Sequence, residues 1–267
     1  MKEVWINDVK DSVIDPADRA LAYGDGLFAT MKVKQGQIQF LEQHLRRLSD
    51  GAARLGFAFS AGGALLFRLN ELATLNPDAC IKLLLSRGSG GRGYTAPKSP
   101  VPLVILSVSP LPSHYVQWQQ KGIGLCKSAV ALGRQPLLAG VKHLNRLEQV
   151  LIKAQSLPQG IDDVWVCDSD GFLVEGSMGN LLLISDKQVL TPALSFAGVS
   201  GVMREQVIHS LLAMGLNVTM GQVTESELLQ ADHVLMTNSL MGAVPVTRLE
   251  DRALTIWPRL SELQQLI

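Results

Sequence analysis

The sequence predicts an α+β fold of two domains, residues 1–112 and residues 113–267. Three observations support this prediction. Short apolar segments such as residues 27–33 are typical of strands. A helical stripe of apolar residues follows them, and a segment with two prolines and two serines at residues 109–115 separates two strand-rich regions. The apolar residues of the stripe step by four, three, four and three, which is the spacing of an amphipathic helix: Leu41, Leu45, Leu48, Ala52 and Leu55.

The smaller N-terminal domain is expected to contain strands followed by helices. A turn at Gln35 and Gly36 makes the segments on either side of it a hairpin. Gly56 is expected to end the helix that follows. The predicted strands are residues 4–6, 27–33, 37–40, 80–85 and 101–108, and the predicted helices are residues 41–55 and 63–75.

The larger C-terminal domain is expected to be richer in strands. A hairpin turn at residues 168–171 joins two of them, and residues 224–227 have the spacing of a helix capping box. The predicted strands are residues 164–167, 172–174, 181–184, 188–190, 217–220 and 232–237, and the predicted helices are residues 144–154, 201–214 and 257–266.

The composition favours a folded protein of the cytoplasm. Hydrophobic residues make up 47% of the 267 residues and charged residues 18%, with a formal net charge of zero. We therefore expect no nucleic-acid partner, and no apolar run is long enough to predict a membrane span. Three cysteines without ligand spacing predict buried thiols in a reducing compartment, with neither disulfides nor a metal site: Cys80, Cys126 and Cys167.

Lys142 is the first residue with a specific chemical interpretation. It follows Gly140 in a predicted loop and lies between apolar residues, just before a predicted helix. A lysine that loses its water there has a lowered pKa and becomes a nucleophile that can form a Schiff base. The alternative is a surface lysine whose aliphatic stem covers apolar neighbours.

Glu175 lies among small residues at the end of an apolar strand, in the segment Val174-Glu-Gly-Ser-Met-Gly-Asn180. A carboxylate in that position can hold a protonated heterocyclic nitrogen. The alternative is a solvated glutamate in a turn, and the segment alone supports both.

Residues 197–204, Ala-Gly-Val-Ser-Gly-Val-Met-Arg, lead from small residues into a predicted helix, with Ser200 as its expected N-cap. Free N–H groups at such a helix end bind phosphate. Ordinary capping explains the same residues equally well.

The segment Ser86-Arg-Gly-Ser-Gly-Gly-Arg-Gly-Tyr94, here called the arginine–glycine loop, combines two arginines with four glycines. Glycine permits sharp turns, and each guanidinium offers a planar fork that suits a carboxylate. The segment lacks the Gly-Lys-Ser/Thr ending of a P-loop, so it does not predict nucleotide binding. A flexible hairpin tip is the alternative to a binding loop.

Taken in their order along the chain, these segments resemble the fold-type IV pyridoxal-phosphate (PLP) enzymes. The motifs Tyr23-Gly-Asp-Gly-Leu-Phe28 and Gln43-His-Leu-Arg-Arg-Leu48 add to the resemblance, which spans residues 5–247. The family includes branched-chain and D-amino-acid transaminases and the aminodeoxychorismate lyases of bacterial folate biosynthesis. The arginine–glycine loop and residues 141–150 are most similar to the lyase branch, which converts 4-amino-4-deoxychorismate to 4-aminobenzoate and pyruvate.

The resemblance implies a role for each matching residue. Lys142 would carry the cofactor and act as the catalytic base, and Glu175 would pair with the pyridine nitrogen. The phosphate would be held by Arg47, the backbone of Val199 and Ser200, and Ser239. Arg92, and with less support Arg87, would bind substrate carboxylates, and Thr30 would donate a proton to the leaving oxygen. Many relatives carry Phe-Glu-Thr where this chain has Ala29 between Phe28 and Thr30, so local substrate contacts can differ.

The family's sites lie between two domains and take side chains from a partner subunit, so the resemblance also implies a homodimer. Two other functions stay open. An aminotransferase acting on branched-chain or D-amino acids would use the same lysine, glutamate and arginine but would need an oxo-acid acceptor. A non-catalytic protein that kept the scaffold would have no chemical need for both Lys142 and Glu175.

Overall fold

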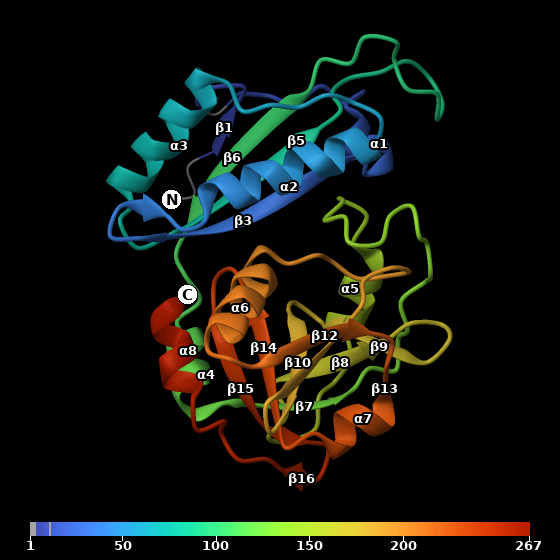
Figure 1. Ribbon diagram of the computed structural model, residues 1–267. Helices are drawn as coiled ribbons and strands as arrows, with labels where there is room; N and C mark the ends of the chain where they lie inside the picture. Colours follow the sequence, from blue (N-terminus) through green and yellow to red (C-terminus); the bar gives the residue numbers. More distant parts are fainter. Residues whose placement is uncertain (1–3, 11) are drawn as a thin grey trace. The chain divides into compact units, whose positions relative to one another are not determined.

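The computed structural model describes residues 4–10 and 12–267 and has two compact units (Figure 1). The first consists of Met1–Pro112 together with Val141–Asn145, and the second consists of Ser113–Gly140 and Arg146–Ile267. The sequence placed Lys142 in the second domain, whereas its segment groups with the first unit. No helix in the described part of the chain is long and apolar enough to cross a membrane.

The first unit is built on a six-stranded sheet in the order β2-β1-β6-β5-β3-β4, all of whose neighbouring strands are antiparallel. Its strands are β1 (Val4–Ile6), β2 (Val9–Lys10), β3 (Gly26–Lys34), β4 (Gln37–Ile38), β5 (Cys80–Ser86) and β6 (Leu103–Ser109). Its helices are α1 (Arg19–Tyr23), α2 (Leu41–Arg54) and α3 (Gly63–Leu75).

Strand β3 separates the core of the first unit from a second, more accessible face. Its residues alternate, so that Leu27, Ala29, Met31 and Val33 are buried while the residues between them are half-exposed. Helix α2 packs on β3 with the apolar stripe that predicted it. A Cβ at Gly51 of α2 would lie 3.0 Å from a methyl group of Leu27, so the glycine allows the close approach.

The second unit is built on a ten-stranded mixed sheet in the order β12-β11-β10-β14-β15-β7-β8-β9-β13, with β16 paired to β15. Its strands are β7 (Ile123–Lys127), β8 (Asp163–Cys167), β9 (Phe172–Gly176), β10 (Asn180–Ser185), β11 (Gln188–Pro192), β12 (Asn217–Gly221), β13 (Val223–Thr224), β14 (His233–Asn238), β15 (Gly242–Leu249) and β16 (Arg252–Ala253). Its helices are α4 (His114–Lys121), α5 (Leu147–Lys153), α6 (Val202–Ala213), α7 (Glu225–Gln230) and α8 (Leu260–Leu266).

Most predicted elements are present, with differences at their ends. The predicted capping box is confirmed, because Thr224 and Glu227 bond reciprocally at the start of α7. The three cysteines are buried and free, as expected. Helix α4 begins inside the predicted linker, and β7 and β15 were not predicted. The predicted strand at residues 37–40 ends at Ile38, because Phe40 takes a left-handed conformation and becomes the N-cap of α2.

Candidate functional site

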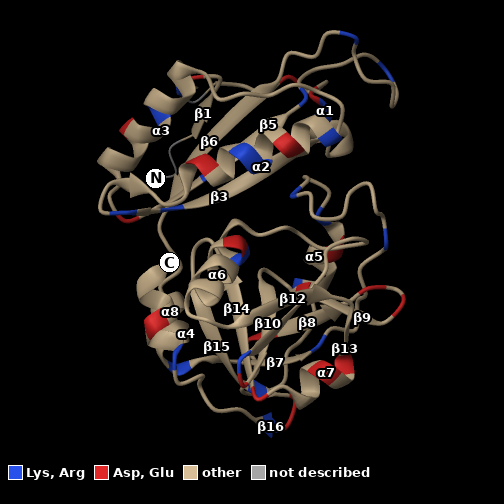
Figure 2. Cartoon of the chain, viewed as in Figure 1, with Lys and Arg blue, Asp and Glu red and all other residues tan. Residues whose placement is uncertain are grey.

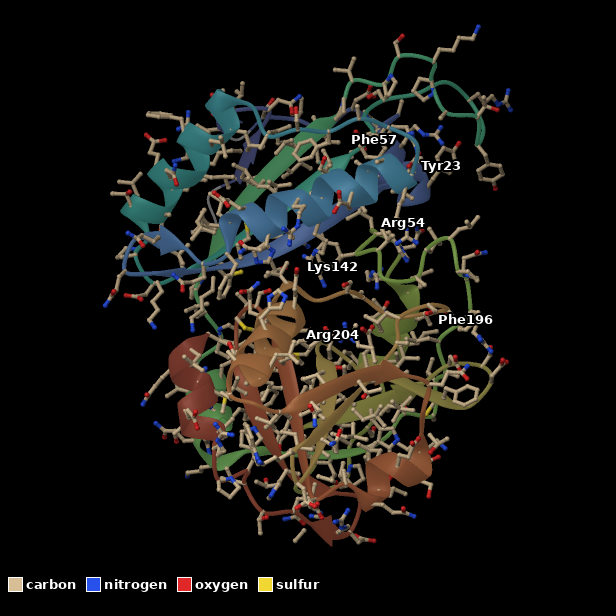
Figure 3. All side chains as sticks on the ribbon, viewed as in Figure 1. Tyr23, Arg54, Phe57, Lys142, Phe196 and Arg204 are labelled. Atoms are coloured by element: carbon tan, nitrogen blue, oxygen red, sulfur yellow. The ribbon has the colours of Figure 1, made fainter. Side chains whose placement is uncertain are left out.

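The segment that carries Lys142 is held against the start of β3. The Phe28 N–H donates to the Lys142 carbonyl at 3.0 Å, and the Leu144 N–H donates to the Gly26 carbonyl at the same distance. Val141 belongs to the core of the first unit and is 4% exposed. The side chain of Lys142 is labelled in Figure 3. Its ammonium lies 4.4 Å from the centroid of the Phe28 ring. Backbone pairing therefore fixes the lysine's main chain beside an aromatic ring.

The Tyr-Gly-Asp-Gly motif makes room for this pairing. A Cβ at Gly24 would lie 2.5 Å from the Asn145 Oδ1, and one at Gly26 would lie 2.3 Å from the Leu85 carbonyl oxygen. Gly24 also has a φ of +63°, in the region that favours glycine. Both glycines are needed so that the lysine segment can lie close to the strand.

Thr30 lies on the same face of the sheet as Phe28. Across the strand pair it is opposite Lys82 of β5, whose ammonium lies 5.1 Å from the Phe28 ring centroid. Two lysines therefore lie near one phenylalanine ring, and Thr30 is on the same face of the sheet. This face favours a ligand that carries negative charge.

Helix α2 supplies the predicted phosphate ligand, and Figure 2 shows the charged residues along it. Desolvation lowers the pKa of the Arg47 guanidinium to about 10, so the side chain stays cationic at neutral pH in an environment where an anion would stabilise it. His44, one turn earlier, is fully buried. Its pKa is lowered to about 3, first by burial and then by the charges of Arg47 and Lys142. Both predicted cofactor cations therefore act electrostatically on His44.

In the second unit the carboxylate of Glu175 is oriented by two donors. Glu175 is 6% exposed at the end of β9. Its Oε2 accepts from the Val199 N–H at 2.9 Å and from the Asn180 amide at 3.5 Å. The same amide donates to the Val199 carbonyl at 2.8 Å. A buried carboxylate held in this way points in a fixed direction, which suits recognition of a protonated ring nitrogen.

The buried Arg204 and the half-buried Arg146 compensate part of the negative charge of Glu175. Burial lowers the pKa of Arg204, and the charge of Glu175 partly opposes that change. The same two effects act on Arg146. Arg204 is held by Thr191 and by the Pro192 carbonyl.

The segment before α6 differs in detail from the prediction. The N-cap is Gly201, so the prediction of Ser200 in that place was wrong. The Val199 N–H is used by Glu175, and the Ser200 N–H donates to the Gly140 carbonyl at 3.0 Å. No side chain caps α6. Its first N–H groups therefore suit an anion better than the two amides that the sequence singled out.

Ser239 lies in the turn between β14 and β15 and is half-buried. Asn238 shapes this turn by accepting from the Leu240 and Met241 N–H groups at 2.9 Å. The Asn238 amide donates to the Met178 carbonyl at 3.2 Å, which places the turn beside the residues that follow Glu175. The second unit thus brings Glu175, the start of α6 and the Ser239 turn together.

Comparison with known proteins identifies the family of this chain. The model of the family "Amino-transferase class IV" matches residues 26–249.

The chain belongs to this family.

Aminodeoxychorismate lyase of Vibrio harveyi is 37% identical over 91% of the chain and 90% of the relative. The crystal structure of 4-amino-4-deoxychorismate lyase from Pseudomonas aeruginosa has a TM-score of 0.91 and 36% identity, covering 98% of the chain and 97% of that protein. D-alanine aminotransferase of Bacillus licheniformis is 26% identical over 91% of the chain and 86% of the relative. The α+β, fold-type IV prediction is confirmed.

In this class IV aminotransferase family member, the two arginines of the arginine–glycine loop have different surroundings. Arg87 is 7% exposed, and its guanidinium donates to both oxygens of Asp25 and to the carbonyls of Leu55 and Gly56. Little donor capacity is left for a substrate carboxylate. Arg92 is exposed. The two arginines therefore differ, because Arg87 has a structural role whereas Arg92 reaches solvent.

Sequence reasoning missed Lys82, Asn180 and Arg19. Lys82 lies opposite Thr30 only because of the β3–β5 register, which no local pattern specifies. Asn180 is close to Glu175 in the sequence, so an amide five residues after a buried acid was a usable signal. Arg19 gave no signal, because the backbone carbonyls that it binds in residues 93–95 lie more than 70 residues away.

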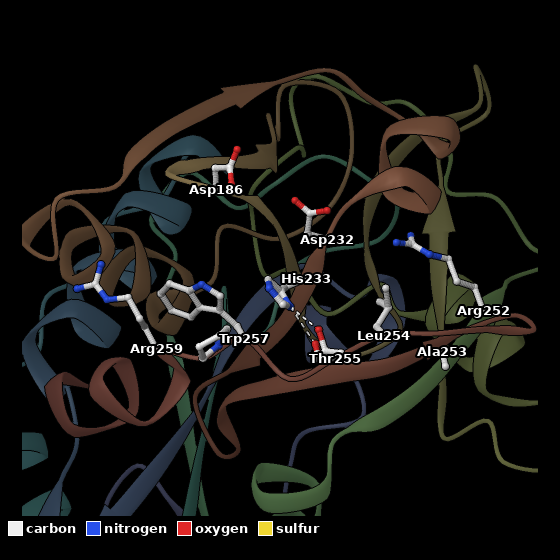
Figure 4. Close-up of a pocket in the computed structure, with 10 residues that line it drawn as sticks. Asp186, Asp232, His233, Arg252, Ala253, Leu254, Thr255, Trp257 and Arg259 are labelled. Atoms are coloured by element: carbon white, nitrogen blue, oxygen red, sulfur yellow. Dashed lines mark hydrogen bonds between the residues drawn. The ribbon is translucent and has the colours of Figure 1, made fainter.

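A separate open pocket of 720 Å³ in the second unit contains none of the predicted site residues (Figure 4). Its arginines are engaged within the protein, since Arg252 donates to the Leu229 and Ala231 carbonyls and Arg259 pairs with Glu262. Its size alone does not connect it to the chemistry of the family.

Proposed function

We propose that the chain is a PLP-dependent lyase that converts 4-amino-4-deoxychorismate to 4-aminobenzoate and pyruvate. Support comes from the 37% identity to an aminodeoxychorismate lyase over nearly the full length of both proteins. The observation that carries the choice is the arginine–glycine loop, which presents Arg92 to solvent while Arg87 holds its base.

Each unit contains residues that suit one part of the cofactor. A phosphate dianion suits the desolvated Arg47, the uncapped start of α6 and the hydroxyl of Ser239. Glu175 would accept a hydrogen bond from the pyridine nitrogen, and Lys142 would carry the cofactor covalently. In the Val199–Ser200 segment, Glu175 and Gly140 fix the backbone, so its proposed contribution is to shape the turn that leads into α6.

When bound, PLP supplies an electron sink for negative charge that develops next to the substrate's amine. Lys142 acts as the base that removes the proton from the amine-bearing carbon. The carbon–oxygen bond to the enolpyruvyl group then breaks, and we propose that the Thr30 hydroxyl donates a proton to the departing oxygen. Arg92 and the positive charge of Lys82 hold the substrate's carboxylates during these steps.

The decisive measurement is product formation from 4-amino-4-deoxychorismate by cofactor-loaded protein without any oxo acid. We expect equal amounts of 4-aminobenzoate and pyruvate, lost in Lys142→Ala because the base is removed. Lys187→Ala, which removes an exposed lysine from the β10–β11 turn, is the matched control and keeps full activity. Turnover that requires an amino donor and an oxo acid would replace the lyase with an aminotransferase.

The role of Thr30 has its own test. Thr30→Val keeps the shape and β-branching of the side chain and removes only the hydroxyl, so the strand is expected to fold normally. A fall in kcat of about 10²-fold is expected for a lost proton donor. Undiminished kcat in this variant would assign the proton to another group.

We further propose that the protein is a cytoplasmic homodimer. Helix α5 and the loop before it expose apolar side chains that monomeric surfaces usually avoid in clusters: Leu137 (78% exposed), Leu147 (77%), Val150 (60%) and Leu151 (58%). Light scattering is expected to give twice the chain mass of 28.9 kDa. A monomeric mass at micromolar concentration would contradict this part of the proposal.

A further inference from the structure

The arginine–glycine loop is wrapped around one side chain, that of Arg19 in α1. Arg19 is 4% exposed although it is an arginine. Its Nη2 donates to the Tyr94 carbonyl at 2.9 Å, and its Nη1 donates to the carbonyls of Gly93 and Thr95 at 3.3 and 3.2 Å. One guanidinium therefore binds three consecutive carbonyl oxygens immediately after Arg92.

The glycines of the loop fit the same side chain. A Cβ at Gly90 would lie 2.8 Å from the Arg19 Cδ, so only glycine lets the backbone pass at this point. The Arg19 N–H donates to the Gly88 carbonyl at 3.1 Å, which fixes the start of the loop as well. Gly91 and Gly93, on either side of Arg92, have no atoms near a would-be Cβ and leave Arg92 room to extend.

Asp25 neutralises Arg19 and links it to the base of the loop. Its Oδ2 accepts from the Arg19 Nε at 2.8 Å and from the Arg87 Nε at 2.7 Å. Burial raises the pKa of Asp25, but the bonds from Arg87 and Arg19 outweigh this and lower it overall. The carboxylate is therefore ionised at neutral pH and holds both arginines.

Aromatic contacts complete the arrangement. The Arg19 guanidinium lies 5.0 Å from the Tyr23 ring centroid, and the Tyr23 and Tyr94 rings are 5.3 Å apart. The far end of the loop is thus held by hydrogen bonds and by ring contacts, even though Tyr94 itself is 87% exposed. The backbone of the arginine–glycine loop is therefore ordered before any ligand binds. Binding then has a smaller cost in conformational entropy.

We propose that Arg19 is a positioning residue for substrate binding, which preorganises residues 88–95 so that Arg92 meets a substrate carboxylate without first ordering the loop. This inference rests on the proposed lyase function for the identity of the substrate. Arg19 does not touch the substrate; it acts through the backbone on either side of Arg92.

The test compares Arg19→Ala and Arg19→Lys with the wild-type holoenzyme. Lysine keeps a charge for Asp25 but cannot reproduce the planar fork that binds three carbonyls. In both variants we expect KM for 4-amino-4-deoxychorismate to rise by at least about tenfold while kcat changes little, because misplacement of a positioned group is costly. Hydrogen exchange of the amides in residues 88–95 is expected to become faster, and the cofactor's absorbance spectrum to stay the same.

Two further measurements separate positioning from a general loss of stability. Guanidinium ion at low millimolar concentration is expected to restore KM in Arg19→Ala, because it can refill the vacated position. Arg68→Ala removes a guanidinium of the same unit that pairs with Asp8 and Glu71, and it should leave KM and loop exchange unchanged.

The inference is overturned if the wild-type protein makes 4-aminobenzoate and the folded Arg19→Lys variant has an unchanged KM. It is also overturned if the rate of hydrogen exchange in residues 88–95 does not change. If the wild-type protein makes none, the proposed function fails instead, and the two failures are therefore distinguishable.

Discussion

Arg87 and Arg92 lie in one loop, yet the fold uses them in opposite ways. Arg87 is buried, and Asp25 and two backbone carbonyls take up its donors. The Arg87 guanidinium also lies 4.8 Å from the centroid of the Phe57 ring. Arg92 is exposed between two glycines. An arginine can therefore stabilise the fold or be available to bind a carboxylate ligand. Which of the two it does depends on the groups that already surround it.

The largest expected effect is on stability, from Arg87→Ala. The change leaves Asp25 with one cation and removes the donors to the Leu55 and Gly56 carbonyls, and losing one partner of a buried pair costs about 3–5 kcal/mol. Urea unfolding of the variant should show this loss in the free energy of unfolding. A loss below about 1 kcal/mol would place Arg87 among ordinary surface arginines.

Arg92→Ala is the converse case. No buried partner is disturbed, so the free energy of unfolding should stay within about 0.5 kcal/mol of the wild-type value. The value of kcat/KM should fall by about 10- to 100-fold, as expected for the loss of a charged hydrogen bond to substrate. A variant with full kcat/KM would remove Arg92 from the site.

The buried His44 and the exposed His209 differ in the same way, and pH is the variable that tests this difference. The folded-state pKa of His44 is about 3, below its ordinary value of 6.5, so between these values only the unfolded chain binds the proton. The free energy of unfolding should therefore fall by about 1.4 kcal/mol for each unit that the pH drops below 6.5. His44→Leu should flatten this dependence. His209→Leu, at an exposed position, should leave it intact.

Salt should produce the smallest effect. Because Arg92 is exposed, added salt screens its attraction for an anionic substrate, and KM should rise about two- to fivefold between low and 0.5 M ionic strength. In Arg92→Ala the rise should be reduced. An equal rise in both proteins would assign the attraction to other charges, with Lys82 the first to test.

The local elements were predictable because each depends on neighbouring residues. The stripe from Leu41 predicted α2 nearly to its last residue, and α3 spans residues 63–75 as predicted. The start of α6 was misjudged by one residue, because capping geometry distinguishes Ser200 from Gly201 and sequence preference alone does not. Helix α4 was missed because prolines and serines around its start favour a loop.

Residues of the candidate site could be predicted where they belong to a local sequence motif. They could not be predicted where long-range packing brings them to the site. Lys142 and Glu175 could be singled out from local segments, and Arg47 from the family resemblance of residues 43–48. The saturation of Arg87 could not, because Asp25 and the Leu55 carbonyl are brought to it by long-range packing. Lys82 could not be predicted for the same reason, because the pairing of β3 with β5 brings it near the Phe28 ring.

The membership of Val141–Asn145 in the first unit has a consequence for synthesis of the chain. Residues 1–112 leave the ribosome before the segment that completes their core with Val141 and pairs with Gly26 and Phe28. The first unit therefore emerges unfinished, and its final packing waits until residues 113–140 of the second unit have also emerged. A fragment ending at residue 112 should be poorly folded when expressed alone, and a peptide of residues 138–147 supplied in trans is the natural complement to it.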